Sequence, residues 1–233
     1  MNEIVMECRG VWKNYGKISA LRDVHLQFKR GRIYGLLGPN GSGKTTLIKI
    51  ANGLLHPSAG KLLINGKEPG VESKNVVSYL PDCVALPEWM KISQLIKFYA
   101  DFYADFDKNR AQDMLKSLGL DPEQKFKTLS KGNKEKVQLI LVMSRNAQLY
   151  LLDEPMGGVD PATRDYILNT IISNYSPDAA VVISTHLITD IENVLDEVIF
   201  IDRGGITLTD TVDNIREVNG KSVDALFREV FRC

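Results

Sequence analysis

The 233-residue sequence predicts an α/β fold in which helices cover a mostly parallel sheet. Short apolar runs that are typical of buried strands lie at 33–37, 149–153, 179–183 and 197–201. Between these runs, apolar residues recur at helical spacing. The block 88–146 is helical in character throughout and interrupts the alternation. We therefore expect a helical subdomain inserted into an α/β core.

Both ends of the chain extend this plan. Strands are expected at 3–9 and 24–28, since polar His25 and Gln27 alternate there with apolar residues, and they form an N-terminal antiparallel β-subdomain. Gly204 and Gly205 lead into a final hairpin strand. A helical tail with an apolar stripe follows, and packing against its own core is its preferred interpretation over a contact with a partner.

Composition limits the class of protein. Lys+Arg and Asp+Glu both number 29, which argues against a general nucleic-acid binder, so no nucleic acid is expected as a partner. No apolar run approaches the roughly 20 residues that span a bilayer. Cys8, Cys83 and Cys233 show no metal-binding spacing and are interpreted as reduced thiols.

The most specific motif is a glycine-rich loop between a strand and a helix. It fits the pattern G-x-x-x-x-G-K-[ST] at every fixed position. The helix behind it is predicted from one apolar face made of Leu47, Ile50, Ala51 and Leu54. The residues of this phosphate loop are Gly38, Pro39, Asn40, Gly41, Ser42, Gly43, Lys44, Thr45 and Thr46.

The chemistry of this loop predicts a P-loop NTPase core that binds ATP. Glycines allow the backbone N–H groups to form a concave nest, and the helix start adds further donors and a positive dipole end. Lys44 brings a charge to the outer phosphates, and Thr45 offers a hydroxyl group to Mg²⁺. A glycine-rich turn that binds nothing would not need this Lys-Thr pair.

A second motif is the apolar strand at 149–152, which ends in Asp153 and Glu154. Parallel strands of doubly wound sheets direct their carboxyl ends at the ligand. We expect Asp153 to hold Mg²⁺, directly or through water, and Glu154 to polarise the water that attacks the γ-phosphate. Two acids in an exposed loop are the alternative, which the phosphate loop disfavours.

Three further segments follow in a recognisable order. Leu129-Ser130-Lys131-Gly132-Asn133 precedes a helical stretch, a turn at 156–161 follows the two acids, and His186 ends a strand. With these segments the chain resembles the ATP-binding subunit of an ABC transporter, of the exporter-type branch, over nearly its full length. Segment 129–133 occupies the place of the family signature L-S-G-G-Q.

The resemblance implies several site roles. Tyr15 would stack on adenine, although a packed edge tyrosine is the alternative. His186 would contact the γ-phosphate and join Glu154 and Lys44 as catalytic residues. Asp160 lies in the predicted dimer-contact turn. The signature residues that would complete the site of a second copy are Ser130, Lys131, Gly132 and Asn133.

Two departures from the family pattern affect these roles. Lys131 stands where Gly is usual and Asn133 where Gln is usual, so we expect retained but altered activity. Asp82 aligns with a glutamine that contacts Mg²⁺ and water. An acid there predicts a further metal contact, and a plain turn residue after Pro81 is the alternative.

The resemblance also implies partners and location. Two copies, identical or not, would enclose two ATP molecules and drive a separately encoded transmembrane permease subunit, more consistent with export than with import. The chain would then sit on the cytoplasmic face of the cell membrane, held by the permease. The contact is expected at 83–91 and the first inserted helix, through Val84, Leu86, Trp89 and Met90. Ordinary packing of the insert would explain the same apolar residues.

One ABC ATPase domain is expected, with a nucleotide-binding core at 1–82 and 147–210, a helical subdomain at 83–146 and a tail at 211–233. A soluble ABC-type ATPase that acts on nucleic acid or the ribosome is the alternative function. Its members carry long coiled coils or tandem domains, which this sequence lacks. The order of the motifs disfavours a third possibility, an unrelated P-loop ATPase.

Overall fold

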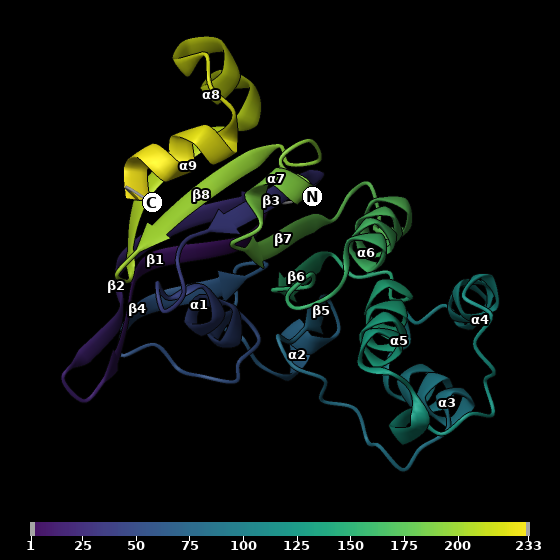
Figure 1. Cartoon of the computed structure of the whole chain (residues 1–233). Helices are drawn as coiled ribbons and strands as arrows, with labels where there is room; N and C mark the ends of the chain where they lie inside the picture. Colours follow the sequence, from purple (N-terminus) through teal and green to yellow (C-terminus); the bar gives the residue numbers. More distant parts are fainter. Residues whose placement is uncertain (1–2, 232–233) are drawn as a thin grey trace.

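A six-stranded sheet forms the centre of the computed structural model, which describes residues 3–231 (Figure 1). Its strand order is β5-β6-β7-β3-β8-β9, and only β8 and β9 pair in antiparallel fashion. The predicted mostly parallel α/β core is therefore confirmed. The strands are β3 Arg32–Leu37, β5 Val77–Leu80, β6 Leu149–Asp153, β7 Ala180–Thr185, β8 Glu197–Asp202 and β9 Gly205–Thr211.

The N-terminal part forms a second, antiparallel sheet with strand order β2-β1-β4. Its strands are β1 Ile4–Tyr15, β2 Ile18–Lys29 and β4 Ala59–Ile64. β1 and β2 are longer than predicted. β1 continues past a register shift at Gly10, which adopts φ +59°, and β2 pairs with this extension from Ile18 onwards. The antiparallel β-subdomain is thus confirmed, with Tyr15 at its tip.

The helix after the phosphate loop is shorter than predicted. α1 spans Lys44–Ala51 and buries Leu47 and Ile50, as expected. Leu54 lies beyond its end and is 57% exposed, so the predicted apolar face is wrong at this position. The cause is Gly53, which adopts φ +66° and ends the helix before Leu54.

Other helices connect the strands. α2 Val71–Lys74 precedes β5, and α6 Pro161–Asn174 joins β6 to β7. α7 spans Ile188–Ile191 and continues as a turn, in which the Val194 N–H donates to the carbonyl oxygen of Ile191, before β8 begins at Glu197.

The inserted helices form a block of their own beside the sheet (Figure 1). They are α3 Ile92–Phe102, α4 Lys108–Ser117, the 3₁₀ turn η1 Phe126–Thr128 and α5 Lys131–Met143. Gly119 adopts φ +64° just beyond α4, as expected of a helix stop. The block has a separate apolar cluster, in which Phe126 is fully buried.

Arg145 fastens this block to the core. Its guanidinium is buried, forms an ion pair with Asp105 and donates to the carbonyl oxygen of Val77 on β5 at 2.6 Å. It also donates to the carbonyl oxygens of Lys74 and Asn75. One side chain therefore joins the end of α2, the start of β5 and the helical block.

The C-terminal tail packs on the core, as predicted. It consists of α8 Val212–Asn219 and α9 Val223–Phe231. The ring of Phe227 lies 5.4 Å from that of Phe200 on β8. Cys8 is buried and Cys83 is exposed, whereas Cys233 lies outside the described residues.

Candidate active site

The phosphate loop connects β3 to α1 and closes tightly against the sheet. A Cβ on Gly38 would lie 2.3 Å from the Ile201 carbonyl oxygen, so only glycine fits there. Gly43 adopts φ +116°, where a side chain would also meet the carbonyl of Ala20. These contacts fix the loop in one conformation around a hollow of about 250 Å³. Loop residues Asn40, Gly41, Ser42, Gly43, Lys44, Thr45 and Thr46 line it.

Lys44 folds back over this loop. Its side chain is buried, and Nζ donates to the carbonyl oxygens of Gly38 at 2.7 Å and Pro39 at 3.2 Å. The same ammonium lies 3.5 Å from Oε1 of Glu154. A full positive charge is thereby held at the mouth of the loop, between the strand end of β3 and that of β6.

Asp153 is buried at the end of β6 and directed towards α1. Its Oδ1 accepts hydrogen bonds from Ser184 Oγ at 2.5 Å and Thr45 Oγ1 at 3.2 Å. Burial raises the pKa of Asp153 above its ordinary value, against the lowering effect of these two hydrogen bonds, and the charges of Asp82 and Glu154 add to the rise. Ser184 was not among the predicted site residues, because only the fold places its hydroxyl beside this carboxylate.

Two buried oxygen atoms at this site have no hydrogen-bond partner within residues 3–231. They are Asp153 Oδ2 and Ser42 Oγ. A buried carboxylate oxygen without a hydrogen-bond partner is energetically unfavourable, and a bound cation would remove this cost. With the Thr45 hydroxyl nearby, this all-oxygen donor set fits a hard divalent cation such as Mg²⁺.

Glu154 adopts an unusual backbone conformation, with φ +48°. Its N–H donates to the Ser184 carbonyl oxygen at 3.0 Å, and its carbonyl oxygen accepts from Gly157 N at 3.0 Å. Left-handed backbone is costly for a residue with a side chain and is found at functional sites. This conformation brings Oε2 to 3.0 Å from Nδ1 of His186, the residue directly after β7.

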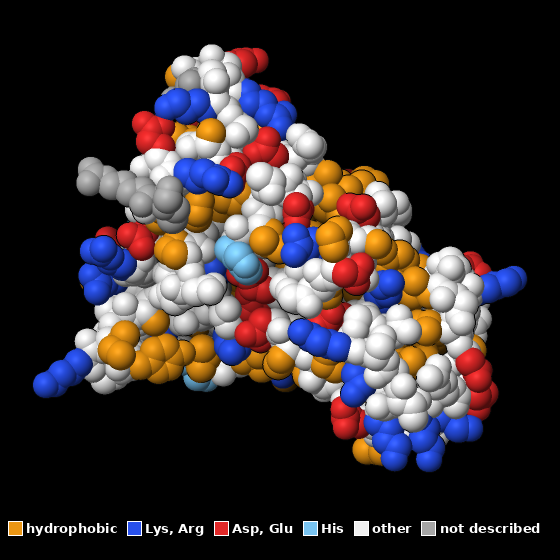
Figure 2. Space-filling model, in the orientation of Figure 1, with side chains coloured by type: hydrophobic (Ala, Val, Ile, Leu, Met, Phe, Trp, Pro, Cys, Tyr) orange, Lys and Arg blue, Asp and Glu red, His pale blue; other side chains and the backbone are white. Residues whose placement is uncertain are grey.

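Asp82 and Tyr15, two further predicted site residues, differ in their relation to the loop hollow, since Asp82 is among the residues that line it and Tyr15 is not. Asp82 is exposed and lines the same hollow as Lys44 and Glu154. Tyr15 is 47% exposed at the tip of β1, with Lys13 Nζ 5.3 Å from its ring centre. The face of the molecule in Figure 2 carries a group of acidic side chains beside a histidine near its centre.

The signature segment begins a helix in the inserted block. Ser130 caps α5, since its Oγ accepts from the N–H of Asn133 at 3.3 Å. Lys131 and Gly132 form the first turn of α5. Within the part of the chain that the structure describes, no hydrogen bond or ion pair joins segment 130–133 to the phosphate loop. The two predicted halves of the site therefore have no direct polar link in one copy, although Lys131 and Glu154 line one hollow of about 520 Å³.

Asp160 begins α6. Its two carboxylate oxygens accept from Thr163 N at 3.0 Å and from Thr163 Oγ1 at 2.7 Å, and these bonds lower its pKa. Pro161 follows at the first helical position, where its missing N–H costs nothing. Asp160 thus fixes the turn at 156–160 directly after the two site carboxylates.

The predicted docking residues do not form one exposed patch. Trp89 is 71% exposed, but Met90 is buried and packs into the helical block. Val84 and Leu86 are half-buried against the same cluster. The prediction is therefore wrong for Met90, whose side chain packs inside the block, next to the residues that follow in α3. Among residues 3–231, no helix has the length and apolar character needed to cross a membrane.

Comparison with known proteins identifies this arrangement. The sequence profile of the family described as ABC transporter matches residues 21–157. The ABC transporter ATP-binding protein YtrB of Bacillus subtilis (strain 168) is 29% identical, over 91% of this chain and 74% of its own. The daunorubicin resistance ATP-binding protein DrrA3 of Streptomyces coeruleorubidus is 27% identical, over 98% of this chain and 75% of its own.

Solved structures show the same fold. The ATP-binding subunit of an ABC transporter superposes with a TM-score of 0.87 and 27% identity, over 97% of this chain and 99% of that chain. A dimeric ATP-binding cassette in a post-hydrolysis state, bound to ADP and phosphate, has a TM-score of 0.77 and 21% identity. It covers 88% of this chain and 98% of its own. The chain thus belongs to the ABC transporter family, as an ATP-binding subunit with ATPase activity.

Proposed function

We propose that two copies of this subunit, or one copy and a related subunit, enclose two ATP molecules and drive a separately encoded permease. The observation that carries this proposal is that no hydrogen bond or ion pair joins the phosphate loop to segment 130–133 within the described residues of one copy. Buried Lys44 and Asp153 and half-buried Glu154 form one half-site at the carboxyl ends of β3 and β6. Ser130 and Gly132 form the other half at an exposed helix start, so a second copy must bring them together.

The phosphate loop would hold the triphosphate through its backbone N–H groups and Lys44, and Tyr15 would stack on the adenine. Mg²⁺ would be held by Thr45 and Asp153, with Asp82 close enough to line the same hollow. When bound, this ion neutralises phosphate charge. Ser184 and Thr45 already orient Asp153 Oδ1, which leaves the orphaned Oδ2 for the ion.

Glu154 is the proposed general base. Its left-handed backbone directs the carboxylate towards the mouth of the loop, where it lies between Lys44 and His186. A carboxylate in this position accepts a proton from the attacking water, and positioning of that water lowers the barrier further. His186 Nδ1 holds Oε2 of Glu154 in place, and the rest of its ring is available to the γ-phosphate.

Export is the proposed direction. Two relatives, the linearmycin resistance ATP-binding protein LnrL and the daunorubicin resistance ATP-binding protein DrrA3, are named for resistance to a compound, which suits removal of a compound from the cell. Attachment to a permease would place the subunit on the cytoplasmic face of the membrane. The exposed Trp89 and the hollow of about 500 Å³ between β5 and α3 are the proposed contact surface.

The decisive experiment is Glu154→Gln. This change keeps the shape of the side chain and removes the base, so ATP binding should persist while turnover falls by about 10²–10⁴-fold. ATP should also trap a dimer, which light scattering measures. Glu88→Gln is the matched control, because Glu88 is an exposed acid outside the loop hollow. Wild-type turnover in Glu154→Gln would show that another group is the base.

Purification from membranes tests the partner. The subunit should co-purify with a polytopic membrane protein. Recovery with ribosomes or DNA instead would favour the soluble ABC-type ATPase.

A further inference from the structure

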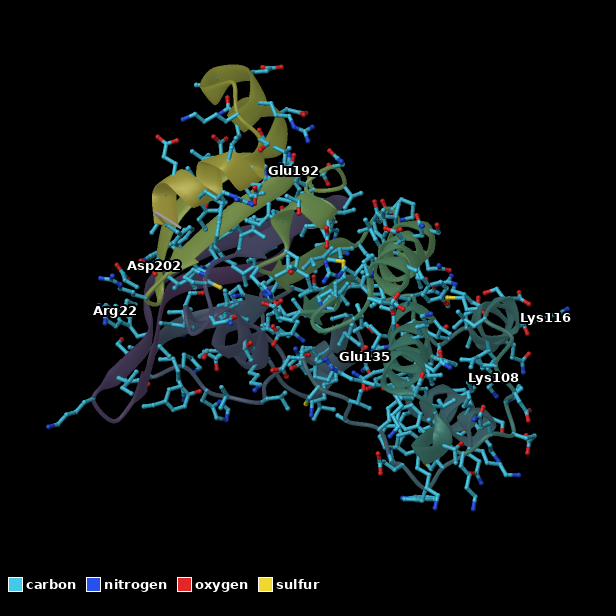
Figure 3. The ribbon with its side chains drawn as sticks, in the orientation of Figure 1. Arg22, Lys108, Lys116, Glu135, Glu192 and Asp202 are labelled. Atoms are coloured by element: carbon cyan, nitrogen blue, oxygen red, sulfur yellow. The ribbon has the colours of Figure 1, made fainter. Side chains whose placement is uncertain are left out.

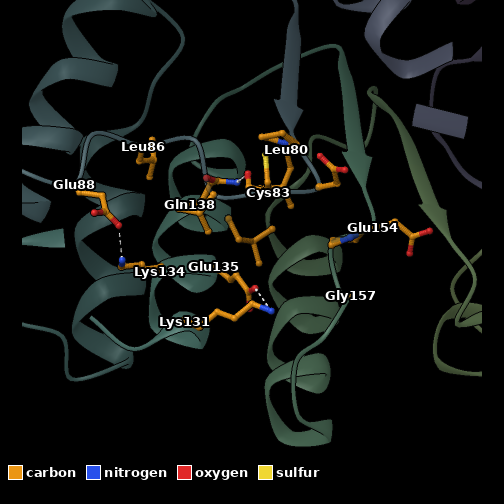
Figure 4. A pocket seen from close by; sticks show the side chains of 15 residues that line it. Leu80, Cys83, Leu86, Glu88, Lys131, Lys134, Glu135, Gln138, Glu154 and Gly157 are labelled. Carbon is orange, nitrogen blue, oxygen red and sulfur yellow. Dashed lines mark hydrogen bonds and ion pairs between the residues drawn. The ribbon is translucent and has the colours of Figure 1, made fainter. Parts of the chain in front are cut away.

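Lys131, the unusual residue of the signature segment, already has a partner in its own chain. Its Nζ lies 3.8 Å from Oε1 of Glu135, one helical turn further along α5. The same ammonium lies against the turn that follows the site carboxylates, since a Cβ on Gly158 would be 3.1 Å from it. Figure 4 shows Lys131 and Glu135 joined in a hollow of about 520 Å³ that Glu154 and Gly157 also line.

Glu135 depends on this lysine. Its side chain is only 20% exposed, and its Oε2 is a buried atom with no hydrogen-bond partner in the described residues. Burial raises the pKa of Glu135, and the nearby Lys131 opposes the rise. The other basic groups of this turn are engaged, since Lys134 pairs with Glu88 at 2.7 Å and Lys136 lies over the ring of Tyr166.

The position of Glu135 differs from that of an ordinary surface acid. In Figure 3 Glu135 lies on the side of α5 nearest the central strands, whereas Lys116 of α4 projects from the outer edge. Lys131 itself is 73% exposed and flexible, so it can leave Glu135 without disturbing the helix. The pair is weak because its lysine end is exposed and its atoms are 3.8 Å apart, and a triphosphate carries several negative charges against the single charge of Glu135.

We propose that Glu135 is a positioning residue that holds Lys131 in the nucleotide-free subunit, and that Lys131 leaves it for the terminal phosphate of ATP bound by the second copy. This inference rests on the proposed two-copy site. Glu135 then competes with the phosphate for one ammonium. When Lys131 moves to the phosphate, Glu135 loses its counter-charge, and this cost opposes the joining of the two copies. Glu135 therefore sets the ATP concentration at which the two copies join.

The test uses ATP-driven dimerisation of the full chain carrying Glu154→Gln, followed by light scattering against ATP concentration. Adding Glu135→Gln should lower the ATP concentration at half-maximal dimerisation by about two- to fivefold, which is the effect expected from the loss of one weak ion pair. In a chain that also carries Lys131→Gly, Glu135→Gln should have no effect. Glu88→Gln, which removes a neighbouring acid of the same hollow, should leave the midpoint unchanged.

The outcomes separate the two proposals. An equal effect of Glu135→Gln with and without Lys131, or no effect in either, overturns the handover while the two-copy site stands. Failure of Glu154→Gln to dimerise with ATP at all overturns the two-copy site and the handover with it. Thermal unfolding of each variant shows whether the helix start at Ser130 is intact, which distinguishes a lost fold from a lost competitor.

Discussion

The two half-sites of this subunit differ in how far their geometry is fixed before ATP arrives. In the core half, Lys44 and Asp153 are buried and each already has hydrogen bonds within the protein. In the signature half, Ser130 and Lys131 are exposed at the start of α5. One half is therefore preorganised for tight binding of phosphate, whereas the other presents exposed groups, held only by local contacts, to a ligand bound elsewhere.

Among substitutions in the two half-sites, Lys44→Ala should have the largest effect on ATP binding. Removal of a buried, charged donor should weaken ATP binding by about 10- to 100-fold, because hydrogen bonds to charged groups contribute about 1.5–3 kcal/mol. Titration calorimetry measures the loss. Lys49→Ala on the same helix removes the same charge outside the loop hollow and should bind ATP normally. Unchanged binding by Lys44→Ala would contradict the phosphate-loop assignment.

A smaller effect is expected from Ser184→Ala, which removes a hydroxyl that orients Asp153 without touching the nucleotide. Loss of such a supporting hydrogen bond typically weakens metal binding by 10- to 100-fold, and we expect about tenfold for Mg²⁺ in the presence of ATP. Mg²⁺ dependence of turnover measures it.

Ser78→Ala is the control for this prediction. Ser78 is equally buried, but it lies on β5 and donates to the Val142 carbonyl oxygen, away from the carboxylates. Both variants should lose a little stability, and only Ser184→Ala should change the Mg²⁺ requirement. The same Mg²⁺ dependence in the two variants would mean that Asp153 needs no support from Ser184.

The smallest effect on binding is expected in the signature half. Ser130→Ala should leave ATP affinity of a single copy unchanged, because none of the hydrogen bonds of Ser130 within residues 3–231 goes to the phosphate loop of that copy. It should cost about 1 kcal/mol of stability, the usual value of a helix cap. Dimerisation with ATP should fall, and thermal unfolding and light scattering separate the two effects.

Ser130→Asp separates the capping role of Ser130 from its role in the dimer. An aspartate caps the helix equally well, but it places a negative charge where a phosphate of the ATP bound by the second copy should lie. Its stability should be that of the wild type, and its dimerisation should be lost. If Ser130→Asp dimerises normally with ATP, the signature half does not meet a phosphate.

Sequence reasoning predicted the core half well, because its chemistry is local. The phosphate loop needs a strand before it and a helix after it, and both are visible around Gly38 and Lys44. It did not predict Ser184, whose hydroxyl reaches Asp153 only because β6 and β7 pair in register. The exposure of Leu54 was missed because a positive φ at Gly53 ends the helix one turn early.

In the inserted block, the sequence predicted the helices but not which side chains are buried. Helical periodicity predicted α3 and α4, but it could not distinguish a buried Met90 from an exposed Trp89 in a loop without period. The pair of Lys131 and Glu135 has helical spacing and could have been proposed, yet the closeness of Lys131 to Gly158 depends on how α5 faces the core.

The buried Arg145 has a mechanical consequence. It follows α5 directly and fixes that end of the block to β5, whereas Ser130 lies at the opposite end of a 13-residue helix. At 1.5 Å per residue, this helix is about 20 Å long. Its second half is packed into the core cluster through Leu139, Val142 and Met143, and Arg145 ties it to β5, the neighbour of the strand that ends in Asp153. The position of Ser130 at the far end of the helix is therefore set by the same strands that position the carboxylates.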